Sequence, residues 1–244
     1  MDAAEDSKMR RKNVPANSPG ASFVPIHGGF RQRALSLGLW FPVFLSSSYF
    51  SQIHPPVLDY DHEHEQDEAM SYQTFCGGIF ETNCYLLDAP DGQILFDAPD
   101  GACDWLESRG AAPRLLLLTH GHFDHVPDVA RIKQRFGCKI GCHADTVPMI
   151  SDPEFFRSYG YALEIAPARP DFVIEAANNR EFLGAGFEVL EVPGHSPGSL
   201  CFLSRERQLL IGGDVLFAGG VGRWDLPGGD GELLFRGIKT KLFP

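Results

Sequence analysis

The chain has 244 residues, of which 43% are hydrophobic, and a formal net charge of −11 at pH 7. This length accommodates one sizeable domain plus an extension. The acidic balance argues against a general nucleic-acid-binding protein, which would present a basic face. It places no limit on the substrate, because a bound metal creates its own local positive field.

Residues 1–69 differ in composition from the rest of the chain. Their uncharged stretch Ala34–Phe50 fits a signal sequence or membrane anchor poorly, because Pro42 interrupts it and its lead-in is long. We therefore expect no stable membrane association. An acidic run with His62 and His64 follows, which we interpret as a solvated linker rather than a metal scavenger.

Met70 stands directly before the first strand-like residues. We interpret residues 1–69 either as a disordered extension or as an over-extended reading of the gene. Residues 70–244 are then the catalytic domain.

Strand-like and helix-like segments alternate through this domain. Apolar or alternating runs predict strands at Tyr72–Cys76, Thr82–Leu87, Gln93–Asp97, Arg114–Thr119, Lys139–Cys142, Arg180–Leu183, Phe187–Val192, Ser199–Leu203 and Gln208–Ile211. Helices are predicted at Asp100–Ser108, Asp124–Phe136 and Gly231–Leu242, with short helical pieces in Ala144–Gly160. The pattern alone predicts an α/β or α+β fold.

The six cysteines are scattered along this domain. A chain of this length does not need disulfides, so we expect free thiols in a reducing compartment, the cytoplasm. Cys138 and Cys142 with His143 resemble half of a zinc site. No second cysteine pair completes it, so we interpret them as small buried residues.

The segment Thr119–His125 places three histidines and an aspartate directly after the apolar run Leu115–Leu118. Such a run predicts a strand buried on both faces, and polar side chains at its end occupy a common position for α/β sites. Alternation predicts that His120, His122 and Asp124 share a face, and His125 is expected in the first turn of the next helix. Imidazole and carboxylate are ligands for zinc and similar ions, and the spacing indicates two adjacent metals.

This segment resembles the T-H-x-H-x-D-H motif of the metallo-β-lactamase superfamily. Val192–Ser199 resembles the loop of the family's third histidine, and Gly212-Gly213-Asp214 resembles the strand end of its bridging aspartate. Gly222–Asp230 is similar to the G-R-x-D-L-P-G-G-D run of the short glyoxalase II-like branch. The resemblance implies a four-layer αβ/βα sandwich, with two mixed β-sheets, outer helices and a metal site at the sheet edge.

The resemblance also implies a ligand set. The first metal is expected on His120, His122 and His195, the second on Asp124 and His125, with Asp214 bridging the two. The family normally supplies one further histidine in a G-H-G segment near the C-terminus, whereas this sequence has no histidine after His195. We interpret this as a truncation that omits the last strand and helix, and we expect weaker metal affinity at the second site.

The implied activity is hydrolysis of a small-molecule thioester, an acylglutathione such as S-lactoylglutathione, by a zinc-bound hydroxide. Up to two Zn²⁺ are expected, with iron or manganese as possible replacements. Asp124 would orient the nucleophile and accept its proton. Arg223 would hold a substrate carboxylate, the alternative being a surface salt bridge. The helical domain with which larger glyoxalase II enzymes grip glutathione has no counterpart in this sequence.

Other interpretations remain open at this point. A persulfide dioxygenase would use one iron on His120, His195 and Asp214. A lactonase or β-lactamase would use the same scaffold, because a fold does not determine its substrate. An inactive metal-binding or interaction protein is the alternative from a different class.

Overall fold

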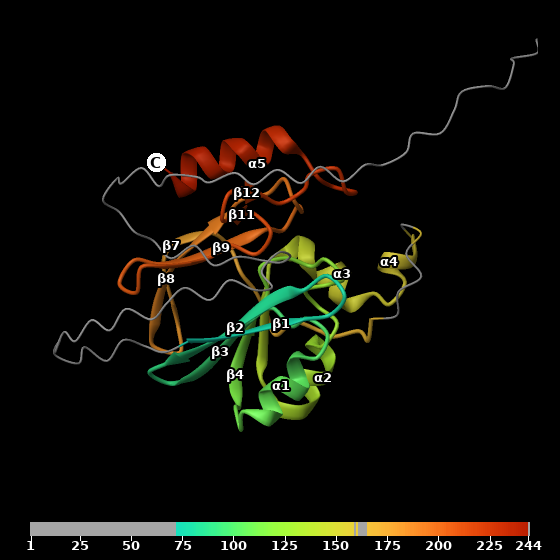
Figure 1. Cartoon of the computed structure of the whole chain (residues 1–244), viewed down its shortest axis with the longest axis vertical. Helices are drawn as coiled ribbons and strands as arrows, with labels where there is room; N and C mark the ends of the chain where they lie inside the picture. Colours follow the sequence, from blue (N-terminus) through green and yellow to red (C-terminus); the bar gives the residue numbers. More distant parts are fainter. Residues whose placement is uncertain (1–71, 159, 161–164, 244) are drawn as a thin grey trace, which may run out of the picture. The chain divides into compact units, whose positions relative to one another are not determined.

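The computed structural model describes residues 72–158, 160 and 165–243. The predictions for residues 1–69 lie outside this range. Within it, the structure has two large β-sheets with helices on their outer faces and one small two-stranded sheet, and the fold class is that predicted. Figure 1 shows α1 (Ala102–Ser108) and α2 (Val129–Phe136) on one side of the first sheet and α5 (Gly231–Gly237) beyond the second sheet.

The first sheet has six strands in the order β1–β2–β3–β4–β5–β6. The first three strands pair antiparallel, and β3 to β6 pair parallel, so this sheet is mixed. The strands are Tyr72–Gly77 (β1), Thr82–Ala89 (β2), Gly92–Phe96 (β3), Pro113–Leu117 (β4), Lys139–Cys142 (β5) and Phe172–Val173 (β6). The first five strands were predicted from the sequence, and their ends agree with the structure to within two residues. The short β6 was not predicted.

The second sheet has four strands in the order β10–β9–β8–β7. They are Ala177–Phe182 (β7), Ala185–Glu191 (β8), Leu200–Ser204 (β9) and Leu209–Ile211 (β10). We expected this sheet to be mixed, but its described strand pairs are all antiparallel. Consecutive strands joined by short connections pair antiparallel, whereas a parallel pair needs a long crossover. Leu216–Phe217 (β11) and Gly220–Val221 (β12) form a separate small pair.

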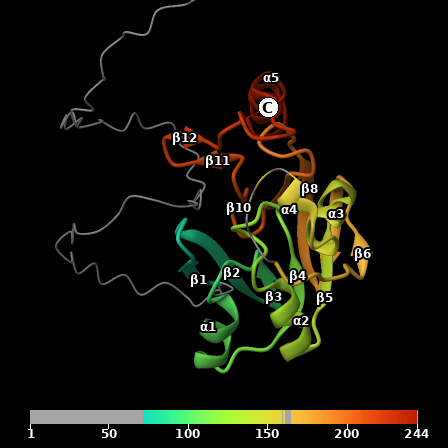
Figure 2. The same cartoon turned by 90° about the vertical axis from the view of Figure 1, so that its right-hand side faces the viewer.

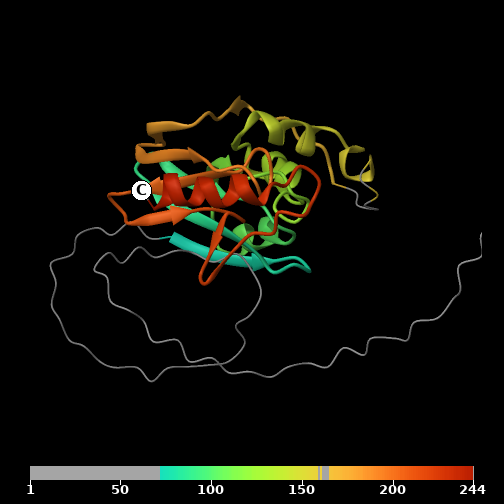
Figure 3. The ribbon, with the colours of Figure 1, turned by 90° about the horizontal axis from the view of Figure 1, so that it is seen from above.

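The helical segments are Ala102–Ser108 (α1), Val129–Phe136 (α2), Ala144–Thr146 (η1), Val147–Ser151 (α3), Phe155–Ser158 (α4) and Gly231–Gly237 (α5), which continues as the π-helix Ile238–Leu242 (η2). Of these, α1 and α2 pack on the outer face of the first sheet and α5 on that of the second. The view turned by 90° keeps α1 and α2 at one end and α5 at the other (Figure 2). From above, α5 lies over the second sheet and runs roughly along its strands (Figure 3).

The layers follow from alternation along buried strands. In β2, Leu86 packs with the cluster beneath α1 and α2, while Leu87 packs between the two sheets. In β9, Phe202 faces the same inter-sheet core, while Cys201 packs beneath α5. Successive side chains of a strand point to opposite faces, so a strand with helix on one side and sheet on the other is apolar throughout. This explains the continuous apolar runs in the sequence.

The helix after the histidine motif begins later than predicted. We expected it from Asp124, but α2 begins at Val129 and His125 lies in a turn. Pro127 disfavours helical geometry at the residue before it. The turn is also tied to the end of β3, because Ala98 N–H donates to the His125 carbonyl at 2.8 Å. His125 is therefore held by the first sheet and not by a helix.

All six cysteines lie in the described part of the chain, and none forms a disulfide. Cys138 and Cys142 are buried in the core beneath α1 and α2, as the interpretation of small buried residues predicted. Within residues 72–243, apart from the gaps given above, the structure has no helix long and apolar enough to cross a membrane.

Candidate metal centre

The predicted ligands meet where strands of both sheets end. His120 and His122 follow β4, while His195 follows β8 and Asp214 follows β10. Asp97 follows β3, the neighbour of β4 in the first sheet. Carboxyl ends of strands that run the same way meet at one edge, where α/β folds usually place their sites. The sandwich therefore brings together residues that are far apart in the sequence.

Three imidazole nitrogens converge on one point. His195 Nε2 lies 2.8 Å from His122 Nδ1 and 3.2 Å from His120 Nε2. His120 and His195 are buried, with exposed fractions of 1% and 2%. Tetrahedral zinc with Zn–N bonds of about 2.05 Å separates its nitrogens by about 3.3 Å. The observed spacings match this value to within about half an ångström.

The rings of His195 and His120 have hydrogen-bond partners on the side that faces away from the centre. These partners determine which ring nitrogen carries the proton. His195 Nδ1–H donates to the Arg223 carbonyl at 2.7 Å. His120 Nδ1 lies 3.1 Å from Thr119 Oγ1, whose own proton goes to Asp97 Oδ2 at 2.7 Å, so His120 is the donor. Both Nε2 atoms therefore present lone pairs to each other. A cation between them removes that repulsion, so these residues fit a metal.

A second group of potential ligands adjoins the first. One atom each of His120, His125 and Asp214 lies within 4.8 Å of the others. His125 Nδ1 donates to Asp97 Oδ2 at 2.9 Å, which directs Nε2 into the centre. That Nε2 is buried, forms no well-aligned hydrogen bond with any described residue, and lies 3.2 Å from Asp214 Oδ1. A buried nitrogen of this kind also fits a metal ion.

Asp214 lies between the two groups. Its Oδ1 is 3.2 Å from His125 Nε2, and its Oδ2 is 3.6 Å from His195 Nε2. One carboxylate thus directs one oxygen to each group, which is the arrangement that a bridging ligand requires.

Asp124 lies at the edge of the second group. Its Oδ2 is 3.6 Å from His125 Nε2 and accepts a hydrogen bond from Thr82 Oγ1 at 2.7 Å. Thr82 begins β2 and is 1% exposed, so the carboxylate is oriented by the rigid first sheet. The predicted pairing of Asp124 with His125 is thus observed as proximity, while His120 lies closer to the second group than we expected.

Two glycines allow the backbone to approach the centre. Gly213, at φ +51°, has no room for a side chain, because a Cβ would lie 2.3 Å from Thr119 Oγ1. A Cβ on Gly222 would lie 1.7 Å from the Asp214 carbonyl oxygen and 3.0 Å from His195 Nδ1. Glycine at these positions lets β10 and the 222–230 loop pass directly against the ligands.

The model of the metallo-β-lactamase superfamily matches residues 77–243. The chain belongs to the metallo-β-lactamase superfamily. It is 36% identical over 172 residues to "Hydroxyacylglutathione hydrolase GloC" of Haemophilus influenzae, covering 68% of this chain and 81% of that protein. It is therefore a metallo-hydrolase of this superfamily.

Two solved structures share the architecture of this superfamily member. BLEG-1 B3 metallo-β-lactamase is 30% identical with a TM-score of 0.65, covering 71% of this chain and 86% of that chain. TTHA1623, crystallised in a di-iron-bound form, is 34% identical with a TM-score of 0.60, covering 70% and 86% respectively. The present chain carries a histidine-rich centre at the sheet edge.

The electrostatics of the centre separate its histidines into two kinds. Burial and the neighbouring imidazoles hold the pKa of His120 well below its usual range and that of His122 at about 3. Burial also lowers the pKa of His195. For His125, burial is outweighed by the carboxylates of Asp214 and Asp97, which raise its pKa well above the usual value. Three neutral imidazoles thus face one protonated imidazole.

Arg223 reaches the centre through its backbone. Its carbonyl accepts the proton of His195 Nδ1 at 2.7 Å. Its guanidinium forms a bidentate pair with Asp225 at 2.8 and 2.9 Å, and both side chains are exposed. Holding a substrate carboxylate would require that pair to open, so the predicted role of Arg223 stays a prediction.

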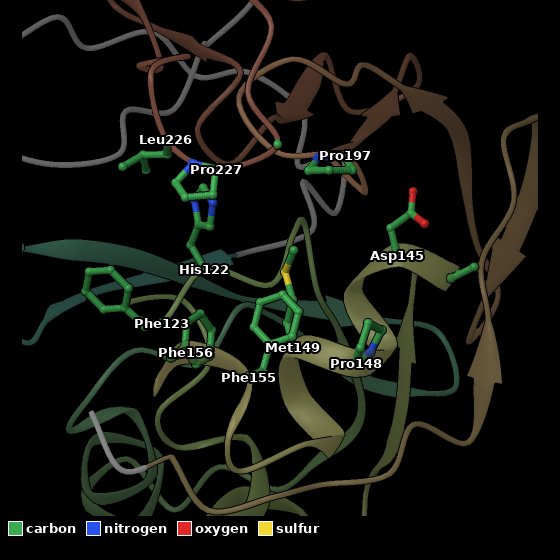
Figure 4. Close-up of a pocket in the computed structure, with 12 residues that line it drawn as sticks. His122, Phe123, Asp145, Pro148, Met149, Phe155, Phe156, Pro197, Leu226 and Pro227 are labelled. Atoms are coloured by element: carbon green, nitrogen blue, oxygen red, sulfur yellow. The ribbon is translucent and has the colours of Figure 1, made fainter. Parts of the chain in front are cut away.

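Three features of this centre do not follow from the sequence. The pattern predicts Asp97 only as a strand end, but it accepts hydrogen bonds from Thr119 and His125. It predicts Thr82 only as the start of a strand, but its hydroxyl donates to Asp124. The third is a pocket beside His122, about 260 Å³ in volume, whose lining side chains are shown in Figure 4. The position of Asp97 at the end of a strand parallel to β4 was the one available signal.

Proposed function

We propose that this chain is a zinc-dependent thioester hydrolase acting on acylglutathiones. The convergence of three neutral imidazoles beside a carboxylate-rich second group carries the proposal. Imidazole donors suit zinc, and the adjoining carboxylates suit a second divalent ion. The similarity to the relative named hydroxyacylglutathione hydrolase supports the substrate class.

We assign the residues the following roles. His120, His122 and His195 would hold a first ion, His125 and Asp124 would hold a second, and Asp214 would serve both. When bound, such ions lower the pKa of a coordinated water and polarise a carbonyl oxygen. Asp124, oriented by the Thr82 hydroxyl, would accept the proton of the attacking water.

The balance of the reaction favours a thioester. A bond forms between the acyl carbon and the water oxygen, the carbon–sulfur bond breaks, and the electron pair leaves with sulfur as a thiolate. A thiol has a pKa of about 8.5, so its thiolate leaves with little protonation. The amine of an amide needs a proton donor, which this assignment of residues does not provide. The six free cysteines support a reducing compartment such as the cytoplasm for this enzyme.

The test is release of thiol from an acylglutathione by the purified chain. We expect turnover with zinc, loss of turnover after removal of metal by a chelator, and recovery when zinc is added back. A chromogenic cephalosporin and a lactone serve as parallel substrates. Hydrolysis of either in place of the thioester would contradict the proposal while retaining a metallo-hydrolase.

A further inference from the structure

A pocket opens directly beside the metal centre. It has a volume of about 260 Å³, and His122 forms part of its wall. The other walls include Phe123, Met149, Phe155 and Leu226. Figure 4 shows the phenylalanines on one side of the pocket and Leu226 with Pro227 across from them. A group bound there would lie next to a reacting carbonyl.

Aromatic rings extend from this pocket toward the surface. Phe155 packs on Phe156 at 5.3 Å between ring centroids, and Phe156 packs on Phe123 at 6.1 Å. Phe123 packs on Phe80 at 5.2 Å, all with edge-to-face geometry. Phe80 lies in the turn between β1 and β2 and is 47% exposed, and its neighbour Ile79 is 90% exposed. An apolar surface therefore continues from the pocket to the rim of the site.

The charges around the pocket indicate which part of a thioester enters it. Among the described residues that line it, the only charged side chain is Asp145, which is 57% exposed. A carboxylate in the pocket would meet this negative charge and no lysine or arginine of the lining. Glutathione carries two carboxylates, so its charged parts are better placed in solvent. The acyl group is the part of the substrate that can be uncharged.

We propose that this pocket binds the acyl group and selects apolar acyl groups over hydroxyacyl or carboxyacyl groups. This inference rests on the proposed thioesterase function and adds its substrate class. The volume lies below the range of about 300–1,000 Å³ that holds drug-sized ligands. The matching substrate is a thioester of a short aliphatic or single-ring acid rather than of lactate.

The first experiment varies the acyl group on a constant thiol. We compare kcat/KM for S-lactoyl-, S-butanoyl-, S-hexanoyl- and S-succinylglutathione with the zinc-loaded full chain. We expect a rise of about fourfold per methylene from butanoyl to hexanoyl, from the transfer of each CH₂ out of water. Lactoyl and succinyl should be the slowest.

The outcomes separate the two proposals. Hydrolysis of every acylglutathione with lactoyl equal to or faster than hexanoyl would overturn the inference and leave the proposed function intact. Hydrolysis of none by a zinc-loaded chain would overturn the proposed function, and the inference with it.

A charge placed in the wall of the pocket tests its location. Leu226 is half-buried in a loop, so the ammonium of Leu226→Lys can reach the pocket mouth. We expect the hexanoyl-to-succinyl ratio of kcat/KM to fall by about tenfold or more. The matched control is Val173→Lys, on a surface residue of β6 that is 44% exposed and does not line this pocket.

This ratio does not depend on the folded fraction of a variant, because both substrates meet the same active molecules. An unchanged ratio in Leu226→Lys, or an equal change in Val173→Lys, would overturn the assignment of the acyl group to this pocket.

Discussion

Replacement of Asp97 by asparagine isolates the residue that orients His125. Asp97 is 2% exposed and accepts three hydrogen bonds, from Thr119 N at 2.8 Å, Thr119 Oγ1 at 2.7 Å and His125 Nδ1 at 2.9 Å. Its backbone has a positive φ of 60°, a conformation that asparagine also adopts. Asp97→Asn therefore preserves the shape and backbone while it removes one acceptor oxygen.

The expected effect follows from where the hydrogen atoms of residue 97, Thr119 and His125 can lie. The new amide N–H faces the Thr119 hydroxyl and His125 Nδ1. The hydroxyl oxygen has two lone pairs, so it can accept this N–H while it still accepts the proton of His120 Nδ1. His125, in contrast, can accept only in the other tautomer, which puts its proton on Nε2. That proton blocks the nitrogen that faces Asp214. A charge-assisted hydrogen bond contributes about 1.5–3 kcal/mol, and loss of such a partner weakens metal binding about 10–100-fold.

The assay is a zinc titration of the metal-free chain against a chelating dye. We expect the first equivalent to bind as in the wild type and the second to bind about 10–100-fold more weakly. Asp104→Asn, which removes a carboxylate on α1 from its exposed pair with Arg131 on α2, should leave both affinities unchanged. Weakening of both equivalents by the same factor, or of neither, would refute the reasoning.

Three further outcomes are expected. Zinc must displace a proton from His125, whose pKa is raised, so affinity for the second equivalent should increase about tenfold per pH unit below that pKa. The zinc affinity of the first equivalent should not vary between about pH 5 and about pH 8, since His122, with a pKa of about 3, has no proton to lose. Zinc titrations at several pH values in which the affinities of both equivalents change equally with pH would contradict both statements. Thr82→Val removes the donor to Asp124 and should lower kcat about tenfold without loss of zinc, measured against the exposed control Thr240→Val. Phe202→Ala should lower the free energy of unfolding by about 3–5 kcal/mol in denaturant melts, because the ring is fully buried between the sheets, and a loss below about 1 kcal/mol would count against the inter-sheet core.

Local signals made most of the fold predictable. Runs such as Leu115–Leu118 are apolar at every position because one face meets helices and the other meets the second sheet. The longer strands were predictable for this reason, whereas the two-residue strands β6, β11 and β12 have no such run and were not predicted. The start of α2 was not predicted correctly, because the tie between Ala98 and His125 is a tertiary contact that helical periodicity does not contain.

In the site, too, local sequence signals predicted some residues, and residues positioned by tertiary contacts were not predicted. Spacing and resemblance brought out the histidines and aspartates that converge in the structure. The residues that orient them, Asp97 and Thr82, come from strands β3 and β2, and only the sheet order places these strands beside the motif. The pocket walls come from five separate segments, around Phe123, Asp145, Phe155, Pro197 and Leu226. No spacing within one segment could indicate that they meet.

The most direct test of the account combines metal content with turnover on one preparation. Mass spectrometry determines the bound metals of the purified chain, and thiol release from a set of acylglutathiones is measured before and after chelation. The account predicts bound zinc and thioester hydrolysis that disappears with the metal and returns with it. A single iron, no thiol release and oxygen uptake with glutathione persulfide would contradict it.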